Sequence, residues 1–262
     1  MSKPLLPQIS CGVFDSLSAF YASKFADYLF FSGLSISASQ FFEVDSGLHS
    51  IERLVDLKLR IASVPNLKPV IADLDDSFGD YSLASTHART LCRAGFFGAI
   101  IEDQARPRKC GHKSGKILNP LNQYVDGLKR FKDSEPSMFL VARTDAETPQ
   151  DISERLNALC ELGSDGIIDA IQIDGISTLE QIRGVTEVLP LSVKFVANHV
   201  EGGRLKCTQL SELGSAGVDI LTLSSFMLSS YISKLESLSL DRDSLPAGGF
   251  SLAQLDELLS QS

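Results

Sequence analysis

A short polar loop near the middle of the chain holds several side chains capable of catalysis. An apolar run over residues 98–101 ends in Glu102, and Lys109, Cys110 and His112 follow soon afterwards. A carboxylate at a strand end suits a hard cation, and a thiol between cationic side chains has a lowered pKa and can transfer protons. The loop predicts a metal-assisted enzyme with Cys110 as proton carrier and Lys109, His112 and Glu102 as further catalytic residues. The alternatives are a surface basic patch or a structural thiol.

A second polar segment follows the apolar run over residues 69–72. It begins Asp73-Leu-Asp75-Asp76, and these carboxylates repel one another unless a cation lies among them. Strand alternation would point Asp73 and Asp75 to the same side, and Glu102 ends the next strand. We predict an all-oxygen site for Mg²⁺, with Mn²⁺ as a possible substitute. Solvated loop acids are the alternative.

Three further segments suit the binding of a carboxylate. Arg143 ends an apolar run and has the planar fork that clamps a carboxylate, although a structural pair with Glu102 or Asp145 is the alternative. The turn Ser32-Gly33-Leu34 can present backbone N–H groups to an anion. Asn198 can donate a hydrogen bond. The predicted substrate-binding residues are therefore Ser32, Gly33, Leu34, Arg143 and Asn198, together with Gly111 in the cysteine loop.

These segments lie at the ends of regularly spaced strands. Short β-rich runs alternate with amphipathic helical patterns, and the predicted strands cover residues 8–14, 27–33, 69–75, 98–103, 138–145, 170–175, 194–199 and 219–224. Helices are predicted over 50–64, 151–162, 177–188, 208–213, 225–238 and 251–259. Such repetition favours a (β/α)8 barrel, whose chemistry lies at the carboxyl ends of the strands. A doubly wound open sheet is the alternative, but no Gly-x-Gly-x-x-Gly follows the first strand.

Composition narrows the class of protein. The 262 residues are 44% hydrophobic and carry a net charge of −9, with scattered lysines and arginines that do not form a nucleic-acid surface. No apolar run could span a bilayer and the amino-terminal residues lack a signal peptide, so we expect a cytoplasmic protein. Five widely spaced cysteines argue against a disulfide framework or zinc cluster. We expect one barrel domain over 1–262, with a linker and helix over 240–262.

The motifs together resemble those of the isocitrate lyase and phosphoenolpyruvate mutase superfamily over roughly residues 8–230. The similar segments are Gly12-Val-Phe-Asp15, Ser32-Gly33, Pro69-Val-Ile-Ala-Asp73-Leu-Asp75, Ile101-Glu102-Asp103-Gln104, Lys109-Cys110-Gly111-His112, Ala142-Arg143-Thr144-Asp145 and Asn198 with Glu201-Gly-Gly203. Gln104 and Cys110 resemble the lyase branch, which includes 2-methylisocitrate lyases. The chain departs from the pattern at Leu34, Ser77, Asp174 and Thr222.

The resemblance has several implications. It implies a (β/α)8 barrel, a metal site of Asp73, Asp75, Glu102 and Asp45, and a homotetramer that exchanges a C-terminal helix. It also implies that Arg143 and the 32–34 turn hold a 2-oxo acid. The reaction implied is cleavage of a carbon–carbon bond in a 2-hydroxy di- or tricarboxylate, with Cys110 as proton donor. Oxaloacetate hydrolysis, phosphonate formation and a non-catalytic dicarboxylate-binding barrel are the alternatives.

Overall fold

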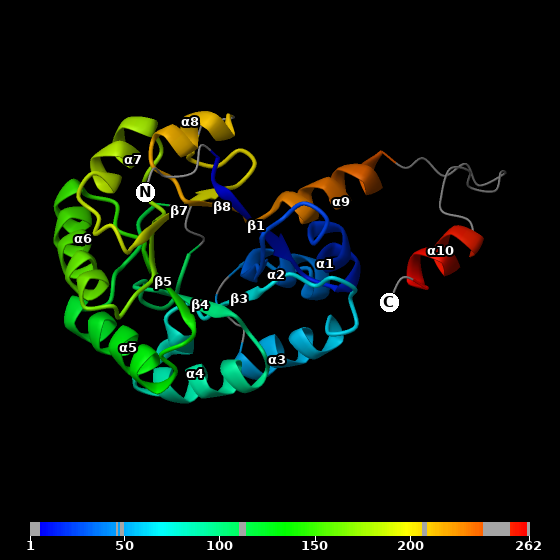
Figure 1. Ribbon diagram of the computed structural model, residues 1–262, viewed down its shortest axis with the longest axis horizontal. Helices are drawn as coiled ribbons and strands as arrows, with labels where there is room; N and C mark the ends of the chain where they lie inside the picture. The colour runs from blue at the N-terminus through cyan, green and yellow to red at the C-terminus, as the bar shows by residue number, and fades with distance from the viewer. Residues whose placement is uncertain are drawn as a thin grey trace.

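The computed structural model describes residues 6–45, 47, 50–109, 114–205, 209–237 and 252–260. Eight parallel strands close into a barrel in chain order (Figure 1). The strands are β1 Gln8–Val13, β2 Tyr28–Phe31, β3 Val70–Asp73, β4 Gly98–Glu102, β5 Phe139–Thr144, β6 Ala170–Ile173, β7 Lys194–His199 and β8 Ile220–Leu223. β1 pairs with β8 and thereby closes the sheet. The predicted (β/α)8 barrel is confirmed.

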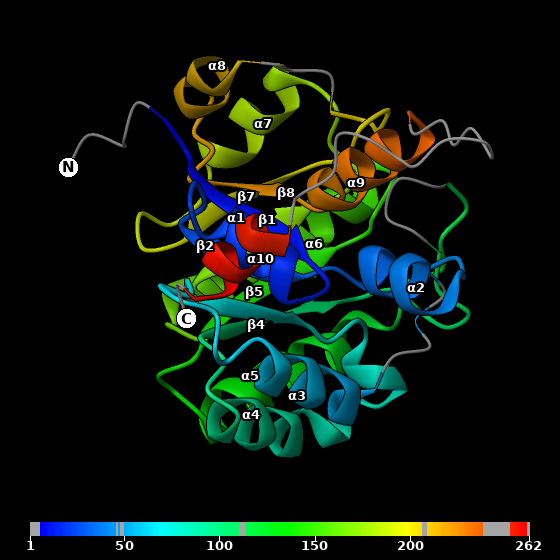
Figure 2. The same ribbon diagram turned by 90° about the vertical axis from the view of Figure 1, so that its right-hand side faces the viewer.

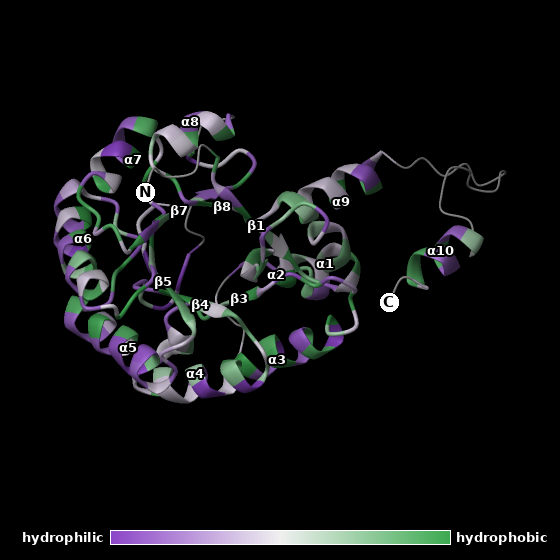
Figure 3. Ribbon diagram, viewed as in Figure 1, coloured by the Kyte–Doolittle hydropathy of each residue, from purple (hydrophilic) through white to green (hydrophobic). Residues whose placement is uncertain are grey.

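Helices follow the strands and surround the barrel, and α3, α4 and α5 lie side by side on one flank (Figures 1 and 2). The helices are α1 Ser16–Ala22, α2 Gly33–Phe41, α3 Ile51–Arg60, α4 Ala84–Arg93, α5 Leu121–Ser134, α6 Pro149–Ser164, α7 Leu179–Thr186, α8 Leu210–Ser215, α9 Phe226–Glu236 and α10 Leu252–Leu259. The short 3-10 helices η1 Ser77–Gly79 and η2 Tyr81–Leu83 lie between β3 and α4. The outer helices carry both hydrophobic and hydrophilic residues (Figure 3), because each has one face on the barrel and one toward solvent.

Helix α7 begins two residues later than the sequence predicted. The predicted range was 177–188, whereas α7 covers Leu179–Thr186. Its N-cap is Thr178, which forms a capping box with Gln181 and so fixes the first turn.

The hydrophobic core has two parts. A large cluster fills the space between the strands and the surrounding helices. A smaller cluster fills the barrel interior with one apolar layer, formed by Phe30, Ile71, Ile100, Val141, Ala170, Val196 and Ile220. This layer closes the barrel below the carboxyl ends of the strands. A ligand would therefore bind above this layer, at the carboxyl ends of the strands.

The C-terminal segment is described only in part. Helix α10 is present over Leu252–Leu259, as predicted, while the predicted linker over 240–251 lies outside the described residues. Leu258 and Leu259 line a cavity together with Leu17 and Phe20 of α1. Within the described residues, no helix combines the length and hydrophobicity needed to cross a membrane.

Candidate active site

A polar layer lies directly above the apolar layer inside the barrel. Seven strands, β2 to β8, each contribute the residue two positions after their residue in the apolar layer. These residues are Ser32, Asp73, Glu102, Arg143, Gln172, Asn198 and Thr222. Side chains two positions apart in a strand point to the same face, so both layers face the barrel axis. The step from apolar to polar side chains marks the floor of the site.

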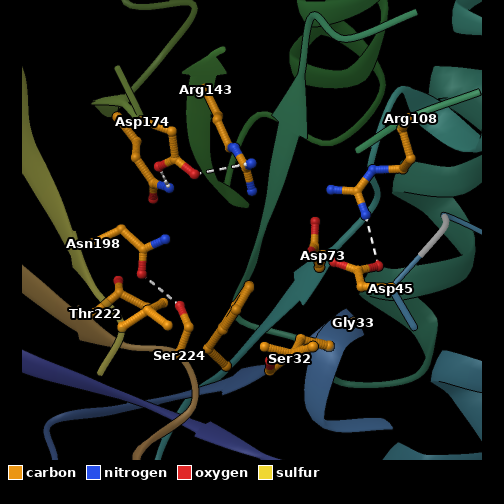
Figure 4. Close-up of a pocket in the computed structure, with 14 residues that line it drawn as sticks. Ser32, Gly33, Asp45, Asp73, Arg108, Arg143, Asp174, Asn198, Thr222 and Ser224 are labelled. Atoms are coloured by element: carbon orange, nitrogen blue, oxygen red, sulfur yellow. Dashed lines mark hydrogen bonds and ion pairs between the residues drawn. The ribbon is translucent and has the colours of Figure 1, made fainter. Parts of the chain in front are cut away.

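A small, partly open cavity of about 40 Å³ lies over this floor (Figure 4). Its lining comes from six of the strands and the loops that follow them: Phe30, Ser32, Gly33, Leu34, Asp45, Asp73, Arg108, Arg143, Gln172, Asp174, Asn198, Val200, Thr222 and Ser224. The structure thus brings together most of the predicted substrate-binding residues. The barrel does this because parallel strands present all their carboxyl ends at one rim.

Arg143 is held in the cavity wall by three carboxylates. Its Nη2 lies 2.9 Å from Asp174 Oδ2, 3.1 Å from the carboxylate oxygens of Asp145 and 3.3 Å from Glu102 Oε2. Burial lowers the pKa of Arg143, but Asp145, Asp174 and Glu102 outweigh this and raise it well above its ordinary value. The Nε atom is buried and has no hydrogen-bond partner within the described residues. Arg143 is therefore a permanently charged, rigidly oriented site for an anion.

The first turn of α2 lies across the cavity from Arg143. The Ser32 side chain caps the helix by accepting a hydrogen bond from the Ser35 N–H, at 3.3 Å, and Gly33 and Leu34 form the first helical positions. All three predicted residues line the cavity, and Figure 4 shows Ser32 and Gly33 at its base. A helix N-terminus favours negative charge. Arg143 and α2 thus attract anions from two sides.

Asn198 lies on the same wall as Asp174. Its Oδ1 accepts a hydrogen bond of 2.6 Å from the Ser224 hydroxyl, which directs the amide (Figure 4). The Asn198 side-chain oxygen is thus paired with Ser224, which fixes the orientation of the amide.

Arg108 occupies the centre of the carboxylate cluster, a position that the sequence reasoning missed. Its Nη1 lies 2.7 Å from Asp45 Oδ1 and 3.2 Å from Asp75 Oδ1, while Nε and Nη2 bind the two oxygens of Glu102 at 2.8 and 3.0 Å. Its side chain is only 1% exposed. Three of the four predicted metal ligands therefore share one guanidinium.

Asp75 lies beyond the end of its strand, so the alternation expected for Asp73 and Asp75 does not extend to it. The strand β3 ends at Asp73, and Asp75 has a positive φ of 49°, which turns its side chain away from the strand pattern. Burial raises the pKa of Asp75 to about 7 against the lowering effect of Arg108, and Asp73 and Asp45 add to the rise. One oxygen, Oδ2, is buried without a partner in the described part of the chain. Negative charge in the cluster is thus incompletely compensated.

The donor chemistry fits a hard divalent cation. No three ligating side chains of the described residues already converge as a metal cage. However, Asp45 and Asp73 both face the cavity. Burial raises the pKa of Asp73 and Asp45 adds to the rise, while Arg108 and Arg143 oppose it only in part. Mg²⁺ commonly binds one or two carboxylates and keeps several waters. Asp45 and Asp73 meet that requirement, with Asp75 and Glu102 behind them.

The cysteine loop is described only at its edges. Cys110, Gly111 and His112 lie outside the described residues. Lys109 is exposed, and its Nζ donates to the Gly115 carbonyl at 2.7 Å, so the structure does not bring this side chain into the cavity. The predicted catalytic roles in this loop therefore remain predictions.

Two residues that hold the loop before Cys110 were not predicted to do so. Gln104 is completely buried, donates to the Lys109 carbonyl at 2.9 Å and to Asp145 Oδ2 at 3.0 Å, and accepts from the Lys109 N–H. Gly47 has a φ of 71°, and a Cβ there would lie 2.2 Å from Arg108 Cδ. Only glycine combines this backbone conformation with such close packing. Neither role produces a periodic signal in the sequence.

Comparison with known proteins identifies relatives along most of the chain. The family model for phosphoenolpyruvate phosphomutase matches residues 3–240. The petal death protein of Dianthus caryophyllus is 32% identical over 221 residues, which cover 80% of this chain and 66% of that protein. The 2,3-dimethylmalate lyase of Eubacterium barkeri is 30% identical over 218 residues, or 81% of this chain and 73% of the lyase. The 2-methylisocitrate lyase of Bacillus subtilis is 29% identical, with 83% and 70% covered.

Solved structures show the same fold. Oxaloacetate acetylhydrolase in complex with 3,3-difluorooxalacetate has a TM-score of 0.85 and 26% identity, with 97% of this chain and 89% of that chain covered. A 2,3-dimethylmalate lyase described as a PEP mutase/isocitrate lyase superfamily member has a TM-score of 0.83. The chain belongs to the phosphoenolpyruvate phosphomutase family.

Proposed function

We propose that this protein is a divalent-metal-dependent lyase that cleaves a carbon–carbon bond in a 2-hydroxy di- or tricarboxylate, such as a 2-methylisocitrate or an alkylated malate. One arrangement carries the proposal: Arg143, the α2 N-terminus and the Asp45–Asp73 pair all line one cavity. An anion site in the same cavity as a pair of oxygen ligands suits a substrate that carries both a carboxylate and a hydroxyl. The relatives named as lyases support this reaction class.

Asp73 and Asp45 would hold the metal, with Asp75 and Glu102 behind them. Mg²⁺ is the ion that the donor set favours, and Mn²⁺ would be accepted by the same oxygens. When bound, the metal supplies Lewis-acid stabilisation of the negative oxygen of the product fragment. Arg108 holds the cluster of carboxylates together around that position.

The chain's own residues bind and orient the substrate. Arg143 holds a carboxylate, because its guanidinium is fixed by Asp145, Asp174 and Glu102. A base removes the 2-hydroxyl proton, the C2–C3 bond breaks, and its electron pair moves onto the departing fragment as an enediolate. Cys110 donates a proton to the carbon of that fragment, with Lys109 and His112 adjusting the thiol pKa. The products are a 2-oxo acid and a second carboxylate.

We further propose that the enzyme is a cytoplasmic homotetramer that exchanges its C-terminal helices. Exposed apolar side chains on α1, the turn after it, α9 and α10 support self-association: Leu17, Tyr21, Phe25, Tyr231, Ile232, Leu235, Leu255 and Leu259. Light scattering after size-exclusion chromatography tests the assembly. A monomeric mass at micromolar concentration would contradict it.

The test of the reaction is an NMR-monitored incubation with Mg²⁺. The panel is 2-methylisocitrate, isocitrate, 2,3-dimethylmalate, oxaloacetate and phosphonopyruvate. A 2-oxo acid should form from one hydroxy acid, and EDTA should abolish its formation. Cys110→Ser should retain Mg²⁺-dependent binding of product while turnover falls by about 10²–10⁴. Turnover of that variant at the wild-type rate would exclude Cys110 as the proton donor.

Oxaloacetate hydrolysis is the second candidate. The structural similarity to oxaloacetate acetylhydrolase supports it. Oxalate and acetate would then appear in the same incubation. A phosphonate would indicate mutase chemistry, while Mg²⁺-dependent ligand binding without any turnover would indicate a binding protein.

A further inference from the structure

We propose that Gln172 selects the substrate by accepting a hydrogen bond from its hydroxyl group, next to the carboxylate that Arg143 holds. This inference rests on the proposed function, since it concerns how that same cavity recognises a hydroxy acid. Gln172 lines the cavity, lies in its polar floor, and pairs in register with Arg143 of the neighbouring strand. A ligand group at Arg143 is therefore adjacent to Gln172.

Asp174 fixes the orientation of the Gln172 amide. The Gln172 Nε2 donates to Asp174 Oδ1 at 2.7 Å, and Asp174 Oδ2 lies 2.9 Å from Arg143 Nη2. A carboxylate only accepts hydrogen bonds, so the amide must present its NH₂ group to Asp174. The carbonyl oxygen Oε1 consequently faces away from Asp174. Asp174 thus contacts both Arg143, which forms the anion site, and Gln172, whose oxygen Oε1 it orients.

The Oε1 atom is left without a partner. It is buried, and no described residue donates a hydrogen bond to it. Buried polar atoms in native proteins are nearly always paired, and an unpaired one costs free energy. At the wall of a ligand cavity, such an atom is explained by a donor that arrives with the ligand.

The donor that fits is a hydroxyl. Carboxylate and oxo groups carry only acceptor oxygens, so they would be repelled by Oε1. In a 2-hydroxy acid, the hydroxyl is on the carbon next to the carboxylate, which matches the adjacency of Arg143 and Gln172. Gln172 would therefore bind the hydroxy-acid substrate better than a deoxy analogue. It is a specificity residue, and Asp174 is the residue that positions it.

Binding of two matched dicarboxylates tests this inference without turnover. Calorimetric titrations with Mg²⁺ compare each malate enantiomer with succinate, which lacks only the hydroxyl. Wild type should bind one malate at least about tenfold more tightly than succinate. Gln172→Met removes the acceptor at similar length and should reduce this preference to less than about twofold, with succinate affinity retained. If Gln172→Met does not fold, Gln172→Asn provides the same comparison, because it withdraws the oxygen by one methylene.

Gln123→Met is the matched control, since Gln123 is an exposed residue of α5 that does not line the cavity. Its preference for malate should equal that of wild type. A preference retained in Gln172→Met, lost to the same extent in Gln123→Met, or missing from wild type overturns the inference. The NMR panel separates the two proposals: loss of preference in Gln172→Met without any lyase turnover supports this inference while the proposed reaction fails. Lyase turnover together with a malate preference that Gln172→Met leaves intact supports the proposed reaction and overturns this inference.

Discussion

Arg108 and Glu102 form a bidentate ion pair at the mouth of the barrel. Nε and Nη2 of Arg108 bind the two Glu102 oxygens at 2.8 and 3.0 Å, and both side chains are 1% exposed. A second face of the same guanidinium binds Asp45 and Asp75. One arginine therefore pairs with three carboxylates of the candidate metal centre and compensates only part of their charge. This relationship has direct consequences for stability.

Replacement of Arg108 by Met should strongly destabilise the metal-free protein. Loss of one partner of a buried ion pair leaves uncompensated charge and costs about 3–5 kcal/mol. Urea denaturation at pH 7 measures the free energy of unfolding. Mg²⁺ should recover more stability in this variant than in wild type, because a cation can replace the missing guanidinium charge. The control is Arg130→Met, whose partner Asp126 is 56% exposed, and which should cost less than about 1 kcal/mol. Equal losses in the two variants would contradict the assignment of Arg108.

Asp145 should make the stability of the protein depend on acid pH. Burial raises the pKa of Asp145, but Arg143 and Lys116 outweigh burial and hold it well below its ordinary value. A lowered folded-state pKa contributes stability that is fully present above the unfolded value near 4 and is lost as pH falls toward the folded value. Asp145→Asn should therefore be less stable than wild type at pH 7. The difference should shrink between about pH 4 and pH 2.

Urea midpoints of wild type and Asp145→Asn at several pH values measure this effect. Asp126→Asn is the control, since that carboxylate is exposed and pairs with Arg130 of its own helix. A constant difference between wild type and Asp145→Asn across the acid range would contradict the role of Arg143 and Lys116.

The cysteines should differ in the rate at which their thiols are alkylated. Cys11 is completely buried, and burial raises its pKa to about 12, so its thiolate is scarce at neutral pH. Burial likewise raises the pKa of Cys160. Cys110, flanked in sequence by Lys109 and near His112, should react faster with iodoacetamide at pH 7.5. Timed labelling with peptide mass spectrometry gives the order. Labelling of Cys11 or Cys160 ahead of Cys110 would contradict a lowered Cys110 pKa.

Arg143→Lys should weaken substrate use although it preserves the charge. Lysine cannot reproduce the planar fork or span the Asp145, Asp174 and Glu102 carboxylates. The expected loss in kcat/KM is about 10- to 100-fold, the value of one charge-assisted hydrogen bond. Steady-state kinetics on the substrate found in the NMR panel measure it. Arg204→Lys, in a partly exposed pair with Glu147, should retain kcat/KM. Equal kcat/KM values for Arg143→Lys and wild type would exclude Arg143 as the carboxylate clamp.

The architecture of this protein follows largely from its sequence. Strand and helix positions are visible as hydrophobic periodicity, because each element buries one face locally. The eight predicted strands and the presence of Asp73, Arg143 and Asn198 at one rim are therefore confirmed. Some helix ends differ from the predicted ranges: the helix predicted over 50–64 is α3 Ile51–Arg60, and the helix predicted over 151–162 is α6 Pro149–Ser164.

The balance of charge within the site was decided by tertiary structure. Arg108 reads as an ordinary loop residue, and only the folded chain places it beside Asp45 and Asp75, which are far away in sequence, as well as Glu102. Gln172 occurs in an apolar strand, and only the position of Asp174 and Arg143 shows which end of its amide lacks a partner. Sequence periodicity reports which face a side chain occupies, whereas pairing depends on distances between loops, and these distances exist only in the folded chain.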